Sequence, residues 1–227
     1  MTGSSGKPCA IFDLDGTLAH TAPDLIGAGN DLFAERGFAP MPLSIAEKTA
    51  GFGGKAIIRA AFDYAGQPRD EAEVDALYQP FLDRYAERIC EESHLYDGVI
   101  DTLETLKARG WIIGVCTNKP EGLARTLLTR LDVLHRFAAL VGADTLPVRK
   151  PDPVALTTAI EWCGADMRAS VMIGDTDTDR DTARRAGVPC ILTSFGYSET
   201  PVADLAPEAV VDSFPELLDA LETVRPR

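Results

Sequence analysis

Cys9-Ala10-Ile11-Phe12 runs directly into Asp13-Leu14-Asp15-Gly16-Thr17-Leu18, and the other segments of the chain are interpreted from this one. The apolar run is short, favours β structure and follows Pro8, which predicts a buried strand that the Asp-Gly pair ends. Because side chains alternate along an extended segment, Asp13 and Asp15 begin on the same face. Two crowded acids are costly unless a cation neutralises them, whereas a polar strand end before a turn needs no cation. Both interpretations stay open at this point.

The composition is that of a globular protein with a full hydrophobic core. The chain has 227 residues, 45% of them hydrophobic, which is enough for one large domain plus an insertion. Its net charge of -13 argues against nucleic acid or an anionic membrane surface as a partner, because both require a basic face. A small anion can still bind where a few cations converge.

The cysteines and the N-terminus indicate the compartment. The five cysteines are odd in number, show no C-x-x-C spacing and fall mostly in apolar segments, which predicts reduced thiols in the core. Residues 1–6 contain no apolar signal region, and no apolar run approaches the length of a membrane span. These features predict a cytoplasmic protein.

The chain then divides into a helical region and an alternating region. Residues 20–93 show helical spacing and turn signals but no convincing strand, with helices expected over 21–36, 44–50, 55–64 and 70–89. From residue 97 onward, helices alternate with short apolar runs at 111–116, 139–141, 170–173, 190–192 and 210–211. This alternation predicts a doubly wound, mainly parallel α/β sheet of the Rossmann-like type. The core would comprise residues 1–19 and 94–227, with 20–93 as an inserted helical domain.

Polar residues follow three further predicted strands. Thr117 and Asn118 stand where a strand meets a helix N-terminus, a geometry that suits an anion but also an ordinary helix cap. Lys150 lies in a proline-restricted loop, where it is either a site cation or a solvated surface lysine. In sheets of this class ligands bind beyond the carboxyl ends of the strands, where Asp13, Thr117 and Asp175 are all expected.

Gly174-Asp175-Thr176-Asp177-Thr178-Asp179 is the most specific of these strand ends. Its recurring acids suggest a hard divalent cation, although an acidic helix N-terminus stabilised by the helix dipole would have the same composition. A calcium loop starting at Asp175 would need glycine at Arg180 and glutamate at Ala186, so that motif fails. Mg²⁺, which needs few protein ligands, fits better.

Taken together, these motifs resemble in order and spacing the four motifs of the haloacid dehalogenase-like hydrolase superfamily: Asp13-x-Asp15-Gly16-Thr17, Thr117-Asn118, Lys150-Pro151 and Gly174-Asp175-x-x-x-Asp179. Four stretches, two of which extend these motifs, are similar to the phosphoglycolate phosphatase branch: Thr21 to Leu25, Thr117 to Pro120, Leu146 to Pro151 and Asp212 to Phe214. The similarity covers nearly all of the chain after Lys7. One departure is Ala19-His20, where many relatives carry an apolar residue and an acid; His20 is then a hinge, substrate-facing or surface linker residue.

The resemblance implies a phosphoryl-transfer mechanism. Asp13 would be the nucleophile that forms an aspartyl-phosphate, and Asp15 would protonate the leaving group and then activate water. Thr117 and the Asn118 N–H would hold phosphoryl oxygens, while Lys150 would offset charge on the phosphoryl group and on Asp13.

The resemblance also implies a cofactor and a cap. Mg²⁺ would be bound by Asp13, the Asp15 carbonyl and Asp175, with Asp179 as a ligand or a support. Residues 20–93 resemble the helical cap that closes over the site in this superfamily. The loop 51–55 falls where the family carries its specificity loop, although a plain connection between two helices remains an alternative. We expect the substrate-binding residues of this region to be Gly53, Gly54, Lys55 and Arg59.

The expected function is a magnesium-dependent phosphatase that converts 2-phosphoglycolate to glycolate and phosphate. The hypothesis for its specificity is that Lys55 or Arg59 recognises the carboxylate of this small phosphorylated metabolite. Other readings stay open: a broader phosphatase or pyrophosphatase, a β-phosphoglucomutase-like phosphomutase, a phosphonate hydrolase, or a non-catalytic phosphate or magnesium sensor. The sequence does not determine whether the protein is a monomer or a homodimer.

Overall fold

A six-stranded parallel sheet forms the centre of the molecule. The computed structural model describes residues 6–224, and the side chains of residues 46–48 lie outside that description. Within it the strand order is β5-β4-β1-β6-β7-β8, and every neighbouring pair is parallel. The strands are β1 (Cys9–Phe12), β4 (Ile112–Cys116), β5 (Ala139–Val141), β6 (Ser170–Gly174), β7 (Cys190–Thr193) and β8 (Ala209–Val211). The doubly wound, parallel α/β core predicted from the sequence is confirmed.

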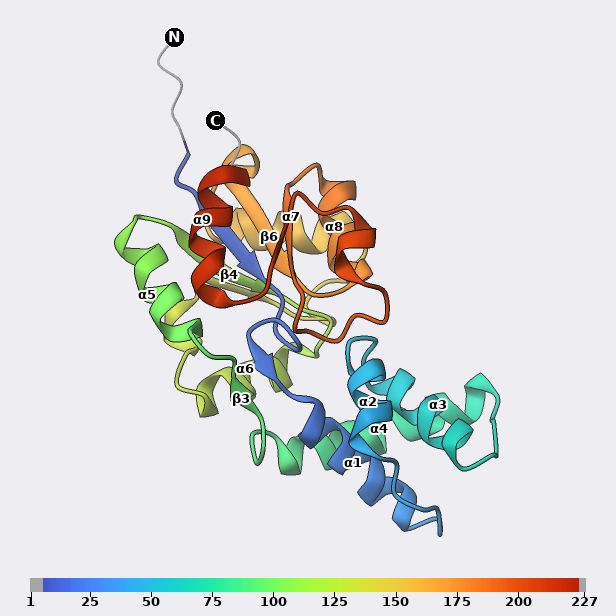
Figure 1. The fold of residues 1–227 in the computed structure, drawn as a ribbon. Coiled ribbons are helices and arrows are strands. Elements are labelled where there is room, and N and C mark those ends of the chain that lie inside the picture. Colours follow the sequence, from blue (N-terminus) through green and yellow to red (C-terminus); the bar gives the residue numbers. More distant parts are fainter. Residues whose placement is uncertain (1–5, 225–227) are drawn as a thin grey trace.

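Helices cover both faces of this sheet (Figure 1). They are α5 (Val99–Ala108), α6 (Glu121–Arg130), α7 (Pro153–Trp162), α8 (Asp177–Ala186) and α9 (Phe214–Val224), with short 3₁₀ turns η1 (Leu134–Arg136), η2 (Met167–Ala169) and η3 (Val202–Leu205). Alternate side chains of β1 enter different cores: Ala10 and Phe12 join the cluster that includes α5 and α9, while Cys9 and Ile11 join the cluster that includes α7. Burial on both faces explains why the strands are continuous apolar runs in the sequence.

The cysteines are free thiols, as predicted. Cys9, Cys116, Cys163 and Cys190 are buried, and Cys90 is half-buried. Burial raises the pKa of Cys116 to about 12, so this thiol stays protonated at neutral pH. Across residues 6–224, no helix combines the length and the apolar character that crossing a bilayer requires.

A helical insertion extends from one end of the core, as Figure 1 shows in blue and cyan. It consists of α1 (Ala22–Ala34), α2 (Leu43–Ala50), α3 (Gly54–Tyr64) and α4 (Glu71–Arg88). All four expected helices are present, and α2 begins at Leu43, one residue before its expected start. Phe33, Phe62 and Phe81 are buried inside the insertion and belong to the same apolar cluster as Phe12 and Leu18 of the core, so the two interiors are continuous.

Two very short strands connect the insertion to the core. β2 (Ala19–His20) and β3 (His94–Leu95) pair antiparallel, with Ala19 opposite Leu95. The sequence did not predict them, because two residues are too few for a periodic signal. Asp24 secures the same junction from α1: its buried carboxylate accepts hydrogen bonds from the backbone N–H groups of Glu92 (2.9 Å) and Ser93 (3.0 Å) and from the Ser93 hydroxyl (2.6 Å). The chain therefore enters and leaves the insertion at adjacent points.

Candidate active site

The polar strand ends converge at the carboxyl edge of the sheet. β4 and β6 flank β1, and each of these strands is followed by one of the sequence motifs. The backbone N–H of Asp13 donates to Ile173 O at 2.8 Å, and that of Thr117 donates to Val141 O at 2.9 Å, so the sheet bonding continues up to the motifs. The sheet therefore fixes the positions of the motif residues Asp13 and Thr117.

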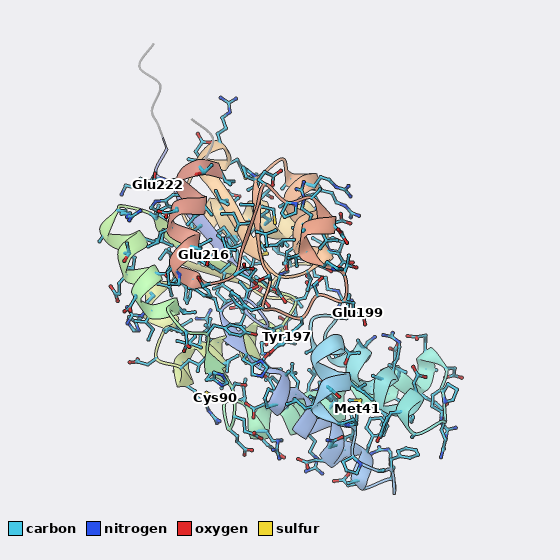
Figure 2. The ribbon with its side chains drawn as sticks, viewed as in Figure 1. Met41, Cys90, Tyr197, Glu199, Glu216 and Glu222 are labelled. Carbon is cyan, nitrogen blue, oxygen red and sulfur yellow. The ribbon has the colours of Figure 1, made fainter. Side chains whose placement is uncertain are left out.

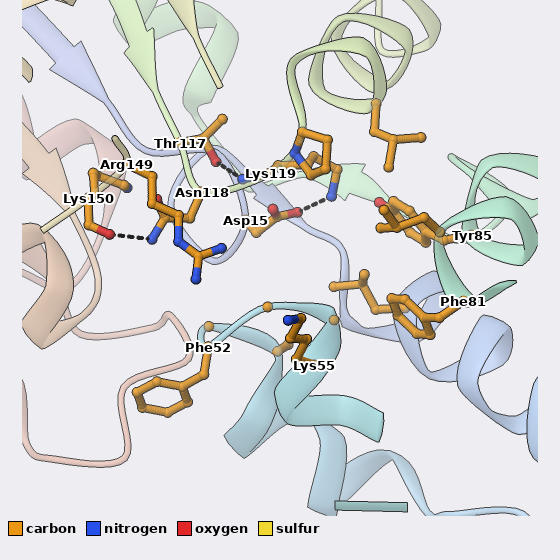
Figure 3. Close-up of a pocket in the computed structure, with 18 of the residues that line it drawn as sticks. Asp15, Phe52, Lys55, Phe81, Tyr85, Thr117, Asn118, Lys119, Arg149 and Lys150 are labelled. Atoms are coloured by element: carbon orange, nitrogen blue, oxygen red, sulfur yellow. Dashed lines mark hydrogen bonds and ion pairs between the residues drawn. The ribbon is translucent and has the colours of Figure 1, made fainter. Parts of the chain in front are cut away.

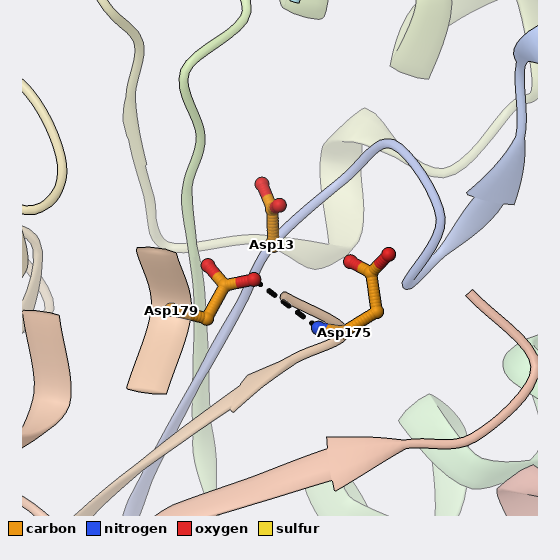
Figure 4. A group of neighbouring side chains, drawn as sticks. All are labelled: Asp13, Asp175 and Asp179. Carbon is orange, nitrogen blue, oxygen red and sulfur yellow. Dashed lines mark hydrogen bonds between the residues drawn. The ribbon is translucent and has the colours of Figure 1, made fainter. Parts of the chain in front are cut away.

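Three buried aspartates form one cluster at this edge. Asp13, Asp175 and Asp179 each offer an oxygen atom within 4.8 Å of the others, and Figure 4 shows the side chains together. Burial raises the pKa of Asp13 to about 6 despite the neighbouring Lys150 ammonium, and the nearby charges of Asp179 and Asp15 add to the rise. Burial also raises the pKa of Asp175 well above its usual range. The ionised forms of Asp13 and Asp175 are therefore electrostatically unfavourable in the folded protein.

Two neighbouring segments orient Asp175. The Thr17 hydroxyl donates to its Oδ1 at 2.8 Å, and the Tyr197 backbone N–H donates to its Oδ2 at 2.7 Å. A Cβ atom at Gly16 would lie 2.3 Å from Asp175 Oδ2, and Gly16 has a φ of +81°, so only glycine lets this loop approach so closely. The Asp-Gly pair therefore does more than end a strand: its glycine makes room for the carboxylate.

Lys150 is the cation of the acidic cluster. Its Nζ lies 2.6 Å from Asp179 Oδ1 and 3.0 Å from Asp13 Oδ1, and its side chain is 2% exposed. Burial disfavours its charge, but Asp13 and Asp179 hold its pKa above the usual range. The Asn118 side chain donates from Nδ2 to the Lys150 carbonyl at 3.0 Å, which ties the Lys150 loop to the loop after β4.

Both carboxylate oxygens of Asp179 accept hydrogen bonds from neighbouring residues. Its Oδ2 accepts from the backbone N–H groups of Asp175 and Thr176, both at 3.1 Å, and from the Thr176 hydroxyl at 2.9 Å. Its Oδ1 accepts from Lys150, so both oxygens already have partners. Asp179 and Thr176 also form a capping box at the start of α8. This arrangement favours the supporting role over that of a metal ligand.

Asp15 faces a second buried cation that sequence reasoning missed. The Lys119 Nζ donates to Asp15 Oδ1 at 2.8 Å, and the Thr21 hydroxyl donates to the same oxygen at 2.7 Å. Lys119 directly follows Thr117 and Asn118, yet nothing in the spacing indicates that its side chain turns back to Asp15. It lies 4.4 Å from the ring centroid of Tyr85, a residue of the insertion. Core and insertion therefore meet beside Asp15.

Comparison with known proteins agrees with this geometry. The sequence model described as haloacid dehalogenase-like hydrolase matches residues 10–193. The chain belongs to the haloacid dehalogenase-like hydrolase family. It is 40% identical over 221 residues to a phosphoglycolate phosphatase of Agrobacterium fabrum, covering 97% of this chain and 95% of that protein. A phosphoglycolate phosphatase of Caulobacter vibrioides is 41% identical over 213 residues, covering 94% and 90%. The crystal structure of a predicted phosphoglycolate phosphatase from Haemophilus somnus superposes with a TM-score of 0.85 at 29% identity, covering 94% and 97%.

A cavity of about 220 Å³ opens between the core and the insertion of this hydrolase (Figure 3). The core contributes Asp13, Asp15, Thr117, Asn118 and Lys150 to its lining. The insertion contributes Gly53, Gly54 and Lys55, so these three expected substrate-binding residues do face the site. The enclosed volume suits a small molecule rather than a polymer.

Two expected residues are placed elsewhere. Arg59 is absent from the cavity lining and instead forms a double contact with Glu71, at 2.9 Å from Nε and 2.6 Å from Nη2. The structure therefore does not bring Arg59 to the site, because α3 directs it to an exposed acid on α4. His20 lies in β2, one of the two strands that join the insertion to the core, where its Nδ1 is 3.1 Å from the Tyr197 hydroxyl. It is absent from the cavity lining, and the hinge and linker roles of His20 stay predictions.

Tyr197 is a further residue that the sequence did not reveal. Its hydroxyl accepts from the backbone N–H groups of Thr21 (2.7 Å) and Ala22 (2.9 Å), while its own N–H holds Asp175. Figure 2 shows Tyr197 where the core meets the insertion. One residue thereby connects the acidic cluster to the first turn of α1.

The donor set fits a hard divalent cation. Three buried carboxylates face one ammonium, that of Lys150, whose Nζ lies 3.0 Å from Asp13 Oδ1, so negative charge remains in excess in the cluster. Oxygen donors with uncompensated negative charge are what Mg²⁺ prefers. In this family member the acidic cluster can therefore hold a metal ion.

Proposed function

We propose that this hydrolase is a magnesium-dependent phosphatase that converts 2-phosphoglycolate to glycolate and phosphate through an aspartyl-phosphate. The observation that carries the proposal is the position of Asp13, which is buried beside Lys150 and lines a small cavity. Asp15 lines the same cavity and is the other acid in its described wall. The names of the relatives from Agrobacterium and Caulobacter support phosphoglycolate as the substrate.

The first displacement forms the covalent intermediate. A carboxylate oxygen of Asp13 attacks phosphorus, and the bond from phosphorus to the leaving oxygen breaks. Protonated Asp15 gives its proton to that oxygen, so glycolate leaves as the alcohol. Lys150, 3.0 Å from Asp13, offsets the negative charge that two approaching anions create.

The second displacement returns the enzyme to its starting state. Asp15, now a carboxylate, takes a proton from water as the water oxygen attacks phosphorus. The bond from phosphorus to Asp13 breaks, which releases inorganic phosphate and leaves Asp15 protonated. Lys119 and Thr21 hold Asp15 during both steps, because both donate to its Oδ1.

The phosphoryl oxygens are held by the loop after β4. We assign the Thr117 hydroxyl and the Asn118 backbone N–H to them, because this loop precedes the N-terminus of α6, where unpaired N–H groups favour an anion. The Asn118 side chain has a different task, since it anchors Lys150. Asp13, the Asp15 carbonyl and Asp175 would hold Mg²⁺, with Asp179 as support. When bound, Mg²⁺ neutralises the phosphoryl charge against which Asp13 must act.

The test is a panel of phosphate esters assayed for inorganic phosphate release with Mg²⁺, using Asp13→Asn as the control. The expected result is a clear preference for 2-phosphoglycolate and loss of turnover in the variant. A flat profile would reject phosphoglycolate as the substrate while leaving a broader phosphatase standing. Turnover that persists in Asp13→Asn would reject the covalent mechanism.

A further inference from the structure

Lys119 is a buried cation whose ammonium group can donate further hydrogen bonds. Its side chain is 3% exposed, and it lines the cavity between Asp15 and the insertion. Its Nζ donates to Asp15 Oδ1 at 2.8 Å, and the lysine ammonium is a donor with no acceptor atom of its own. An ammonium has three N–H donors, and Asp15 Oδ1 accepts one of them. A ligand acceptor in the cavity can therefore reach the same nitrogen.

Tyr85 supplies a second donor from the insertion side of the cavity. It lies on α4 and is 1% exposed, and its hydroxyl lies beside Lys119 but donates to no acceptor among residues 6–224. Burial raises the pKa of Tyr85 to about 12, so the hydroxyl keeps its proton at neutral pH. A buried donor without an acceptor is unfavourable, which suggests that an acceptor arrives with a ligand. Figure 3 shows Tyr85 next to Lys119 and Asp15.

The other cations of the described cavity wall are less suitable for a second anionic group. Lys150 already faces two carboxylates, and Lys55 donates to Asp75 at 2.6 Å. Arg149 is exposed, so water screens its charge. Lys119 differs from these three cations because it is at once buried, able to donate further hydrogen bonds and in contact with Asp15, the residue proposed to protonate the leaving oxygen.

The chemical structure of the substrate places its carboxylate near Lys119 and Tyr85. In 2-phosphoglycolate a single methylene separates the carboxylate from the leaving oxygen, and Asp15 must contact that oxygen. The carboxylate therefore lies close to Asp15, where Lys119 also lies. We propose that Lys119 Nζ and Tyr85 Oη together bind the carboxylate of the leaving group, an inference that rests on the proposed phosphatase function.

This subsite forms only when the insertion lies against the core. Lys119 comes from the loop after β4 and Tyr85 from α4, so a bound carboxylate bridges the two parts. A phosphate ester without a carboxylate leaves both donors unpaired inside the cavity. Selection for the substrate thus results from the unfavourable burial of unpaired donors as well as from direct attraction.

The experiment compares 2-phosphoglycolate with ethyl phosphate, in which a methyl group replaces the carboxylate. The measured quantity is the ratio of kcat/KM for the two esters, because the ratio cancels effects of a variant on phosphoryl transfer itself. Lys119→Met and Tyr85→Phe are each expected to lower the wild-type ratio by about 10-fold to 100-fold, the usual range for a hydrogen bond to a charged group. Tyr85→Phe removes a single oxygen atom, so it keeps the test decisive if Lys119→Met does not fold.

Arg149→Met serves as the matched control, since it removes one cation from the wall of the same cavity, and it is expected to keep the wild-type ratio. Lys55→Met tests the competing hypothesis that Lys55 recognises the carboxylate. An unchanged ratio in Tyr85→Phe overturns the two-residue subsite, and a larger fall in Lys55→Met or Arg149→Met than in Lys119→Met moves carboxylate recognition elsewhere. If wild type itself does not distinguish the two esters, the proposed substrate is wrong, an outcome separate from failure of the subsite.

Discussion

Replacing the proposed nucleophile is expected to stabilise the metal-free protein while abolishing its activity. Asp13 is buried, and its pKa rises from 3.8 in an unfolded chain to about 6 in the fold. The folded state therefore binds this proton more tightly than the unfolded chain does. The stability that Asp13 contributes is fully present below pH 3.8 and is lost as the pH rises through 6. Asparagine has no such charge to bury.

The magnitude follows from the same shift. At pH 7 the ionised carboxylate costs the metal-free fold about 3 kcal/mol, and at pH 5 about half of that. The shift already includes the favourable attraction of Lys150, so no further correction for that ion pair is needed. For a chain of this size, Asp13→Asn should raise Tm by about 6 to 12 °C at pH 7.

The assay is thermal unfolding in EDTA at pH 5 and pH 7, with phosphate release measured in parallel. Asp219→Asn on the exposed face of α9 is a matched control, since it also removes one carboxylate and should leave Tm nearly unchanged. A variant less stable than wild type at pH 7 would refute the reasoning. So would an equal gain at both pH values, because a gain caused by packing does not titrate.

Three other predictions concern the metal, the buried cation and the junction between insertion and core. Mg²⁺ at 100 times its dissociation constant should raise the free energy of unfolding of the wild-type protein by about 2.7 kcal/mol. Asp175→Asn should remove this gain. An identical rise in Tm in both proteins would argue against the acidic cluster as the Mg²⁺ site. Lys150→Met leaves two buried carboxylates without their counter-ion and should destabilise the metal-free protein by about 3 to 5 kcal/mol, measured by urea unfolding in EDTA, whereas a loss below about 1 kcal/mol would contradict the burial argument. Asp24→Ala removes the acceptor of three hydrogen bonds at the junction between insertion and core and should cost about 2 to 4 kcal/mol, with faster limited proteolysis near Ser93; unchanged cleavage there would show that the junction is held by other contacts.

Much of the fold was accessible from the sequence because its signals are local. A strand such as 9–12 or 170–174 is marked by a short apolar run, and a helix by its spacing and its terminal glycine or proline. The motif residues were accessible for a related reason. Parallel strands bring their carboxyl ends to one edge, so residues that follow β1, β4 and β6 must meet there.

The contacts that complete the site were not accessible in this way. Lys119 reaches Asp15 across 104 residues, and Tyr197 holds Asp175 through a backbone N–H that no side-chain pattern reveals. Arg59 shows the same dependence, because a cation near the expected specificity loop was predicted to face the substrate, whereas in the structure it pairs with Glu71. The direction of a long side chain depends on its neighbours in space.

The sequence by itself determined the layers of the fold, the helical insertion and the two acids that follow the first strand, because periodicity and motif spacing are properties of neighbouring residues. Only the tertiary structure decided how those acids are balanced. It places Lys150 against Asp13 and Lys119 against Asp15, two buried cations for two carboxylates. The electrostatic interactions between these charges are strong because water is excluded from them. This burial exists only once the distant segments have packed together.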